Sequence, residues 1–108
     1  MITEPKVASL PLEGSRVMDV THIVAGPFCS MILADMGAEV IKIERPGVGE
    51  RGRGNGPFIH NDAGESISAR YLGRNRNKKS VALDLRDPRC KAAFERMVKE
   101  SDLSLIHI

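Results

Sequence analysis

The chain has 108 residues, of which 42% are hydrophobic and 28% are charged, a composition typical of one folded domain rather than of a disordered segment. Its formal net charge of +2 is too small to indicate binding to nucleic acid or to a membrane. No apolar run approaches the roughly 20 residues of a membrane-spanning helix, and the first residues lack the pattern of a secretory signal. We therefore expect a cytoplasmic protein, or one in an organelle such as the mitochondrion or the peroxisome.

Positive charge is concentrated in the middle of the chain. Residues 1–44 carry three basic and six acidic side chains, whereas residues 45–79 carry eight basic and three acidic ones. The two cysteines, Cys29 and Cys90, lie far apart and lack metal-ligand spacing. Both have apolar neighbours, which predicts two reduced thiols in the core.

The first half of the chain predicts a strand, a helix and a second strand. The segment RVMDVTHIV (16–24) is apolar and β-branched, and its first half is typical of a strand. In GPFCSMILADMG, Pro27 suits the first turn of a helix and Gly37 suits its C-terminal cap. So few residues of this helix are polar that we expect it to be buried on most sides. AEVIKIER (38–45) alternates like a second strand.

The second half of the chain begins with a long irregular stretch. Residues 46–73 are rich in glycine and predict a loop, with one helical turn before Gly73. SVALDL (80–85) predicts a third strand. Asp87 and Pro88 then form a helix start, and apolar residues follow at helical spacing. The chain ends in a fourth strand-like run, SDLSLIHI.

The alternation of strands and helices predicts the fold class. Strand–helix–strand repeats favour an α/β protein with a parallel sheet, flanking helices and right-handed crossovers. We expect residues 1–10 to be a flexible lead-in and residues 11–108 to form the folded part. An apolar strand is an unusual chain end, because ends are commonly polar. The pattern therefore leaves open whether the domain is complete or is the incomplete N-terminal part of a larger one.

Three features at the predicted strand ends could bind an anion. The segment THIVAGPFCS joins the first strand to the first helix, where free N–H groups favour phosphate. His22 could contact a ligand there, although a structural histidine is the commoner case. Arg45 and Arg86 follow the second and third strands and would form a cationic rim at the same sheet edge. Many α/β proteins share such a rim, so it identifies no particular ligand.

Other kinds of site find little support in the residues. The segment GRNRNKKS (73–80) is basic, but aromatic residues make up only 4% of the chain, so a solvated turn is favoured over a nucleic-acid site. The GxGxxG fingerprint, metal-ligand spacing and the G-x-S-x-G nucleophile turn are all missing. No catalytic residue can be assigned from spacing.

Several motifs together resemble a known family. PLEG, VMDVTH, AGPF, LADMGAEVIKIERPG and NRNKKS occur in an order and spacing similar to the N-terminal part of class III CoA-transferases, the formyl-CoA and carnitine CoA-transferase family. The resemblance runs from residue 11 to about residue 102. It implies a Rossmann-like sheet, transfer of coenzyme A between carboxylic acids, and an interlocked homodimer. It implies no metal, no nucleic acid and no membrane.

The resemblance also selects candidate residues for contact with CoA. At the first strand–helix junction these are His22, Val24 and Ala25, where Val24 replaces a glutamine of some members. Arg45 matches the nucleotide-binding arginine of the family, and Arg86 stands where a cation meets phosphate. The full set implied for the acyl-CoA site is His22, Val24, Ala25, Arg45, Leu83, Asp84, Leu85 and Arg86.

Two departures from the family pattern limit the prediction. The residues Ile106, His107 and Ile108 stand where members have Glu-Asn-Phe. The catalytic aspartate of the family lies beyond residue 108, so the chain carries no predicted nucleophile and should not catalyse transfer alone. Two alternatives stay open: a non-catalytic binding or dimerisation module, and the N-terminal part of a 2-methylacyl-CoA racemase.

Overall fold

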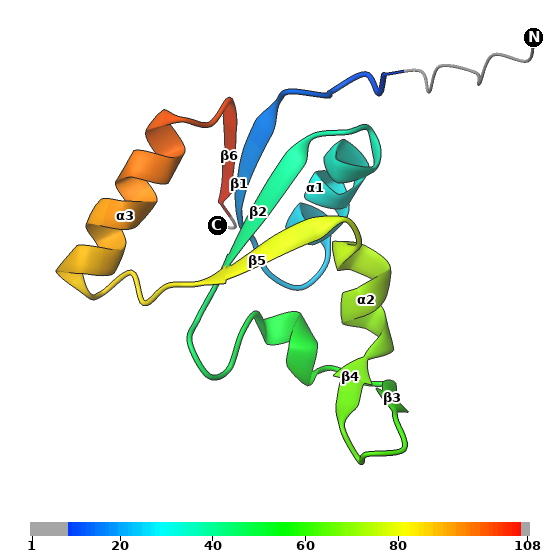
Figure 1. Cartoon of the computed structure of the whole chain (residues 1–108). Coiled ribbons are helices and arrows are strands. Elements are labelled where there is room, and N and C mark those ends of the chain that lie inside the picture. The colour runs from blue at the N-terminus through cyan, green and yellow to red at the C-terminus, as the bar shows by residue number, and fades with distance from the viewer. Residues whose placement is uncertain (1–8, 107–108) are drawn as a thin grey trace, which may run out of the picture.

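The protein folds around a four-stranded parallel sheet, seen in a computed structural model that describes residues 9–106 (Figure 1). The strands lie in the order β5–β2–β1–β6, so the two central strands come first in the chain. All three strand pairings are parallel, which confirms the predicted α/β class. The four strands are β1 (Arg16–Val20), β2 (Glu39–Glu44), β5 (Lys78–Ala82) and β6 (Leu103–Ile106).

The first helix, α1 (Ala25–Asp35), begins two residues before the predicted start at Pro27. Gly37 follows it with a φ of 104°, the left-handed conformation expected of a helix-ending glycine. Burial on most sides was a wrong prediction, because Phe28 is 51% exposed and Ile32 is 41% exposed. Cys29 is exposed too, so it is not a core thiol. The apolar sequence of α1 exceeds what one sheet face can cover.

The third predicted strand, at 80–85, is displaced in the structure. β5 covers Lys78–Ala82, and Lys78 pairs with Val40 of β2. The polar residues at 78 and 79 concealed the start of the strand, because the pairing depends on backbone groups and not on hydrophobicity. Residues 83–86 consequently lie in the turn that follows the strand.

The predicted loop at 46–73 contains regular structure. It holds a 3₁₀ turn, η1 (Arg51–Gly54), and an antiparallel hairpin of β3 (Phe58–His60) and β4 (Ser66–Ser68). Helix α2 (Ala69–Asn75) follows and continues through Gly73, where the helical turn was predicted to end. In Figure 1 the hairpin projects away from the sheet below α2. Ser68 caps α2 by accepting a hydrogen bond from the Tyr71 N–H.

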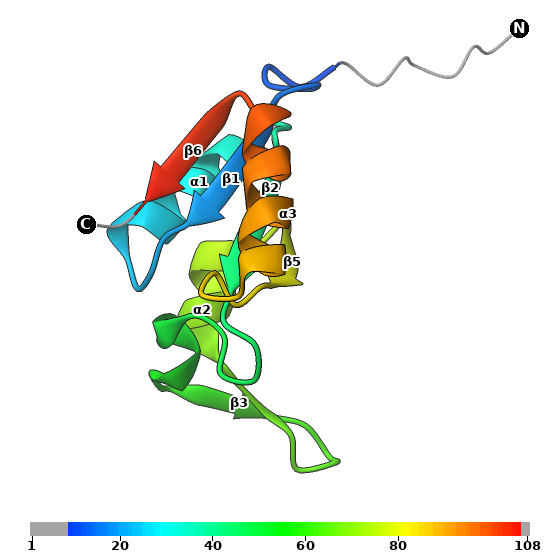
Figure 2. The ribbon, with the colours of Figure 1, turned by 90° about the vertical axis from the view of Figure 1, so that its left-hand side faces the viewer.

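Helix α3 (Pro88–Lys99) has the predicted start, since Asp87 accepts a hydrogen bond of 2.8 Å from the Arg89 N–H. In Figure 2 it stands on the opposite face of the sheet from α1. Its apolar stripe is only half-buried, and Cys90 is half-buried with it. Most of the predicted lead-in (1–10) and the last two residues of the chain lie outside the described residues.

The core of the domain is small and contains buried charges. Val17, Ala34, Ala38 and Val40 pack together between α1 and the sheet. Beyond them towards the carboxyl ends of the strands, four charged residues of the described part of the chain are buried in both backbone and side chain. They are Asp19, Lys42, Glu44 and Glu50. Buried charges are retained when they are paired, and these four lie next to the candidate site.

Candidate functional site

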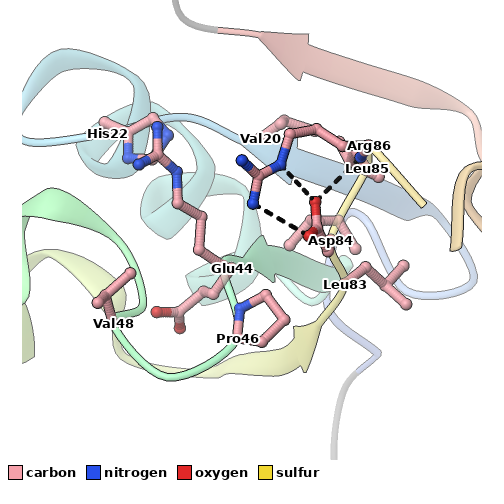
Figure 3. A pocket seen from close by; sticks show the side chains of 11 residues that line it. Val20, His22, Glu44, Pro46, Val48, Leu83, Asp84, Leu85 and Arg86 are labelled. Carbon is pink, nitrogen blue, oxygen red and sulfur yellow. Dashed lines mark hydrogen bonds and ion pairs between the residues drawn. The ribbon is translucent and has the colours of Figure 1, made fainter.

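A pocket of about 500 Å³ opens beside the carboxyl ends of β1, β2 and β5 (Figure 3). The three strands are neighbours in a parallel sheet, so the segments that follow them meet at one edge. Polar and apolar side chains share the lining, as in many ligand sites. The lining residues are Val20, His22, Ile43, Glu44, Arg45, Pro46, Val48, Leu83, Asp84, Leu85 and Arg86.

Most of the residues implied by the family resemblance lie at this pocket. His22, Arg45 and residues 83–86 line it, although they come from three separate segments of the chain. Val24 and Ala25 do not line it: Val24 is the exposed N-cap residue of α1 and Ala25 is its first helical residue. Contact of any of these residues with CoA stays a prediction.

Arg86 is engaged with Asp84 in the same turn. Its Nε lies 3.0 Å from Asp84 Oδ1 and its Nη2 lies 3.1 Å from Oδ2. Dashed lines mark the contacts between these two side chains in Figure 3. The Arg86 hydrogen bonds lower the pKa of Asp84. The Arg86 side chain is 91% exposed, and such surface pairs contribute little to stability. An arriving phosphate can therefore compete with Asp84 for this guanidinium.

Arg45 is the other cation of the pocket. It directly follows β2, and its side chain is exposed. Within residues 9–106 its guanidinium has no ion-pair or hydrogen-bond partner. A guanidinium has five donors in a planar fork, which suits bidentate contact with phosphate. Arg45 is thus the pocket cation best able to take an anionic ligand without breaking another contact.

His22 lines the pocket on the side away from Asp84 and Arg86 (Figure 3). Its Nδ1 accepts a hydrogen bond of 3.4 Å from the Arg51 N–H. Burial lowers the pKa of His22; the carboxylate of Glu50 opposes this shift, and the nearby cations Lys42, Arg51 and Arg45 add to it. The imidazole is therefore neutral at pH 7, with its proton on Nε2, and it can donate one hydrogen bond to a ligand.

Glu44 lines the pocket and is held in place by several hydrogen bonds. Its carboxylate accepts hydrogen bonds from Arg53 at 2.6 and 2.7 Å and from the hydroxyl groups of Tyr71 and Ser80, both at 2.8 Å. It also accepts one from the Glu50 N–H. Burial alone would raise the pKa of Glu44, but these hydrogen bonds outweigh it and lower the pKa to about 2. Glu44 therefore remains ionised and ties β2 to the loop that follows it.

Asp19 and Lys42 form a second buried group on the adjacent strands. Asp19 Oδ2 lies 3.7 Å from Lys42 Nζ, and it accepts hydrogen bonds from Ser30 at 2.6 Å and from Lys78 at 2.9 Å. The Lys78 side chain is only 2% exposed, so the prediction of a solvated turn at 73–80 is wrong for this residue. Sequence reasoning missed this group because its members lie up to 59 positions apart.

Across residues 9–106, no three His, Cys, Asp or Glu side chains come together as metal ligands. None of the helices in the same part of the chain has the length and hydrophobicity needed to cross a membrane.

The sequence matches the model of CoA-transferase family III over residues 12–106. The chain belongs to this family. It is 51% identical over 80 residues to succinyl-CoA:glutarate CoA-transferase of Mus musculus. The aligned region covers 73% of this chain and 17% of that protein. It is also 42% identical over 92 residues to succinyl-CoA:mesaconate CoA-transferase of Haloarcula hispanica. That alignment covers 85% of this chain and 23% of the relative.

A solved structure in the family supports the fold. The crystal structure of a CAIB/BAIF family protein from Brucella suis superposes with a TM-score of 0.81 at 37% identity. The match covers 90% of this chain and 25% of the neighbour. This family III chain thus spans about a fifth of the length of the curated relatives that it matches. The predicted family and the predicted α/β class are both confirmed.

Proposed function

We propose that this chain forms part of the CoA site of an acyl-CoA:carboxylate CoA-transferase. The observation that carries the proposal is the 500 Å³ pocket, at which Arg45, Arg86 and His22 meet in a family III fold. CoA carries a diphosphate and a 3′-phosphate, and guanidinium groups bind phosphate oxygens in pairs. Val20, Ile43 and Leu85 supply apolar wall for the remainder of the ligand.

The proposal assigns no nucleophile to this chain. Asp19 is fully buried and hydrogen-bonded, and Asp35 is paired with Arg76 at 2.6 Å. Asp84 is engaged with Arg86, and Asp87 caps α3. Each of these four carboxylates therefore has a role within the fold. For the whole enzyme we propose the family's aspartate chemistry, with an acyl-CoA and a free carboxylic acid as substrates.

We also propose that the whole enzyme is a homodimer. Support comes from the family resemblance and from apolar side chains that the fold leaves exposed. Phe28 and Ile32 of α1 are 51% and 41% exposed, and Ile59 of the hairpin is 53% exposed. Exposed apolar side chains are a feature of subunit interfaces, and we propose that a second subunit covers these.

Calorimetric titration with CoA tests the proposed site. The variants are Arg45→Ala, Arg86→Ala and the double variant, with Arg96→Ala on the exposed side of α3 as the control. A charged hydrogen bond contributes about 1.5–3 kcal/mol, so each site variant should weaken binding about tenfold or more. CoA lacking its 3′-phosphate should bind more weakly to the unchanged protein. Equal affinity for CoA in the unchanged protein and the double variant would overturn the assignment.

A further inference from the structure

The turn between β1 and α1 contains an unusual residue conformation. Ile23 has a φ of 71°, in the left-handed region that β-branched residues rarely enter. The Val24 N–H donates to the His22 carbonyl across it at 3.1 Å. The three residues thus form a γ-turn with a positive central φ, the rarer and more strained kind. Such a conformation persists only where its surroundings hold it.

Two side chains hold the Ile23 backbone, one at its N–H group and the other at its carbonyl group. Glu50 Oε1 accepts a hydrogen bond of 2.6 Å from the Ile23 N–H, and Arg74 Nη1 donates one of 3.3 Å to the Ile23 carbonyl. They lie 27 and 51 positions away in the sequence. Both backbone groups of the strained residue are therefore satisfied by charged side chains, which form the stronger hydrogen bonds.

Glu50 is itself fixed in place. It is 1% exposed, and its Oε1 also accepts a hydrogen bond of 2.7 Å from the Gly52 N–H. Its Oε2 lies 3.6 Å from Lys42 Nζ and makes no hydrogen bond within residues 9–106. Its own N–H donates to Glu44 at 2.8 Å. A rigid carboxylate of this kind can impose a conformation on the turn that it binds.

The loop residues Glu50 and Arg51 also support His22, which lines the pocket. The Arg51 N–H reaches His22 Nδ1 at 3.4 Å, and Glu50 Oε1 lies 3.9 Å from that nitrogen. Thr21, at the other end of the turn, is held by Asp19 through its N–H and by Lys42 through its carbonyl. The direction of the His22 ring therefore depends on a turn that is bound on every side.

We propose that Glu50 and Arg74 are positioning residues that hold Ile23 in this turn and thereby place His22 at the pocket. The inference rests on the proposed function only in its choice of CoA as the ligand. Neither residue lines the pocket, so both act through His22. This role extends the candidate site beyond its pocket lining, to Glu50 in the loop after β2 and to Arg74 of α2.

Nuclear magnetic resonance and CoA titration together test the proposal on the full chain. The variants are Arg74→Met, Glu50→Ala and Glu50→Gln, of which the last retains the oxygen that accepts from Ile23. The matched control is Arg70→Met, an exposed arginine one turn earlier on α2 with no side-chain partner in the described residues. A strong amide–Hα Overhauser effect within Ile23 reports the positive φ, and amide exchange reports its hydrogen bond.

We expect Arg74→Met and Glu50→Ala to weaken the Overhauser effect and to raise Ile23 amide exchange about tenfold or more. CoA affinity should fall about tenfold in the same variants, whereas Arg70→Met should change nothing. Glu50→Gln should restore part of both properties. An unchanged turn in both variants, or an altered turn with unchanged CoA affinity, would overturn the positioning role.

The outcomes separate this inference from the proposed function. If the unchanged protein does not bind CoA at all, the proposed function fails, while the resonance measurements still decide whether Glu50 and Arg74 hold the turn. If Glu50→Ala does not fold, Arg74→Met still provides the test, because Arg74 is only half-buried. Ile23→Asn supplies a further arm, since asparagine tolerates the left-handed region. It should reduce the effect of Arg74→Met on CoA affinity.

Discussion

Lys42 and Glu50 face each other out of reach of solvent, with Nζ 3.6 Å from Oε2 and both side chains 0% exposed. Lys42 also lies 3.7 Å from Asp19, so one ammonium group serves two carboxylates. This arrangement connects β1, β2 and the loop after β2. It joins the fold to the candidate site.

Lys42→Met should destabilise the domain strongly. The variant leaves Asp19 and Glu50 without their shared cation, and breaking a buried ion pair costs about 3–5 kcal/mol. Lys79→Met is the matched control, because Lys79 is a neighbour on β5 with a side chain that is 72% exposed. Urea unfolding followed by circular dichroism measures both. Similar unfolding free energies for the two variants would contradict the proposed importance of Lys42.

Gly26→Ala should destabilise the turn before α1. A Cβ at this position would lie 2.3 Å from Thr21 Cβ, and Thr21 is buried. Forced overpacking of this kind costs about 1–3 kcal/mol. Gly73→Ala is the control, since a Cβ there meets nothing within 4 Å and lies within α2. Thermal unfolding should show a lower midpoint for the first variant and an equal or higher one for the second.

Stability should fall in acid because of Glu44. Its pKa is lowered from 4.5 to about 2 in the folded protein, so the folded form binds the proton less readily than the unfolded chain. The contribution is complete above pH 4.5 and is lost as the pH falls towards 2. It amounts to about 3 kcal/mol. The unfolding free energy of Glu44→Gln should depend less on pH in this range, and an unchanged dependence would refute the assignment.

Ser68→Ala should weaken the start of α2. The hydroxyl group accepts from the Tyr71 N–H at 3.2 Å and donates to the Asn55 carbonyl. Loss of an N-cap costs about 1–2 kcal/mol. Ser66→Ala, at an exposed position of β4, should change the unfolding free energy by less than about 0.5 kcal/mol. Chemical denaturation measures the unfolding free energy of both variants. Equal losses in the two variants would contradict a stabilising role for the Ser68 cap.

Sequence patterns located most of the elements but not all of their bounds. The Asp87-Pro88 helix start and the glycine after α1 were predicted from local chemistry, and both are present. The start of β5 at Lys78 was not, because two lysines do not read as a strand. The hairpin within residues 46–73 was also missed, because its sequence lacks a clear strand pattern. Its pairing is short, and its apolar side chains remain exposed.

The candidate site divides in the same way. Arg45 and Arg86 could be placed at one sheet edge because the carboxyl ends of parallel strands always meet there. Their partners could not be predicted: Arg86 is paired with Asp84, while Arg45 is unpaired within the described residues. Glu50 was one acid in a glycine- and arginine-rich loop. Nothing in that composition indicated a buried carboxylate beside His22.

The family, the α/β class and the residues available at the strand ends could be inferred from the sequence. These properties depend on short-range periodicity, capping residues and motif order, which are local in the chain. The identity of the buried charges and of the residues that hold the β1–α1 turn became evident in the folded chain. A buried lysine or glutamate requires partners from distant segments to offset its desolvation, as Lys42, Lys78 and Glu50 show. Those partners become neighbours only when the sheet assembles.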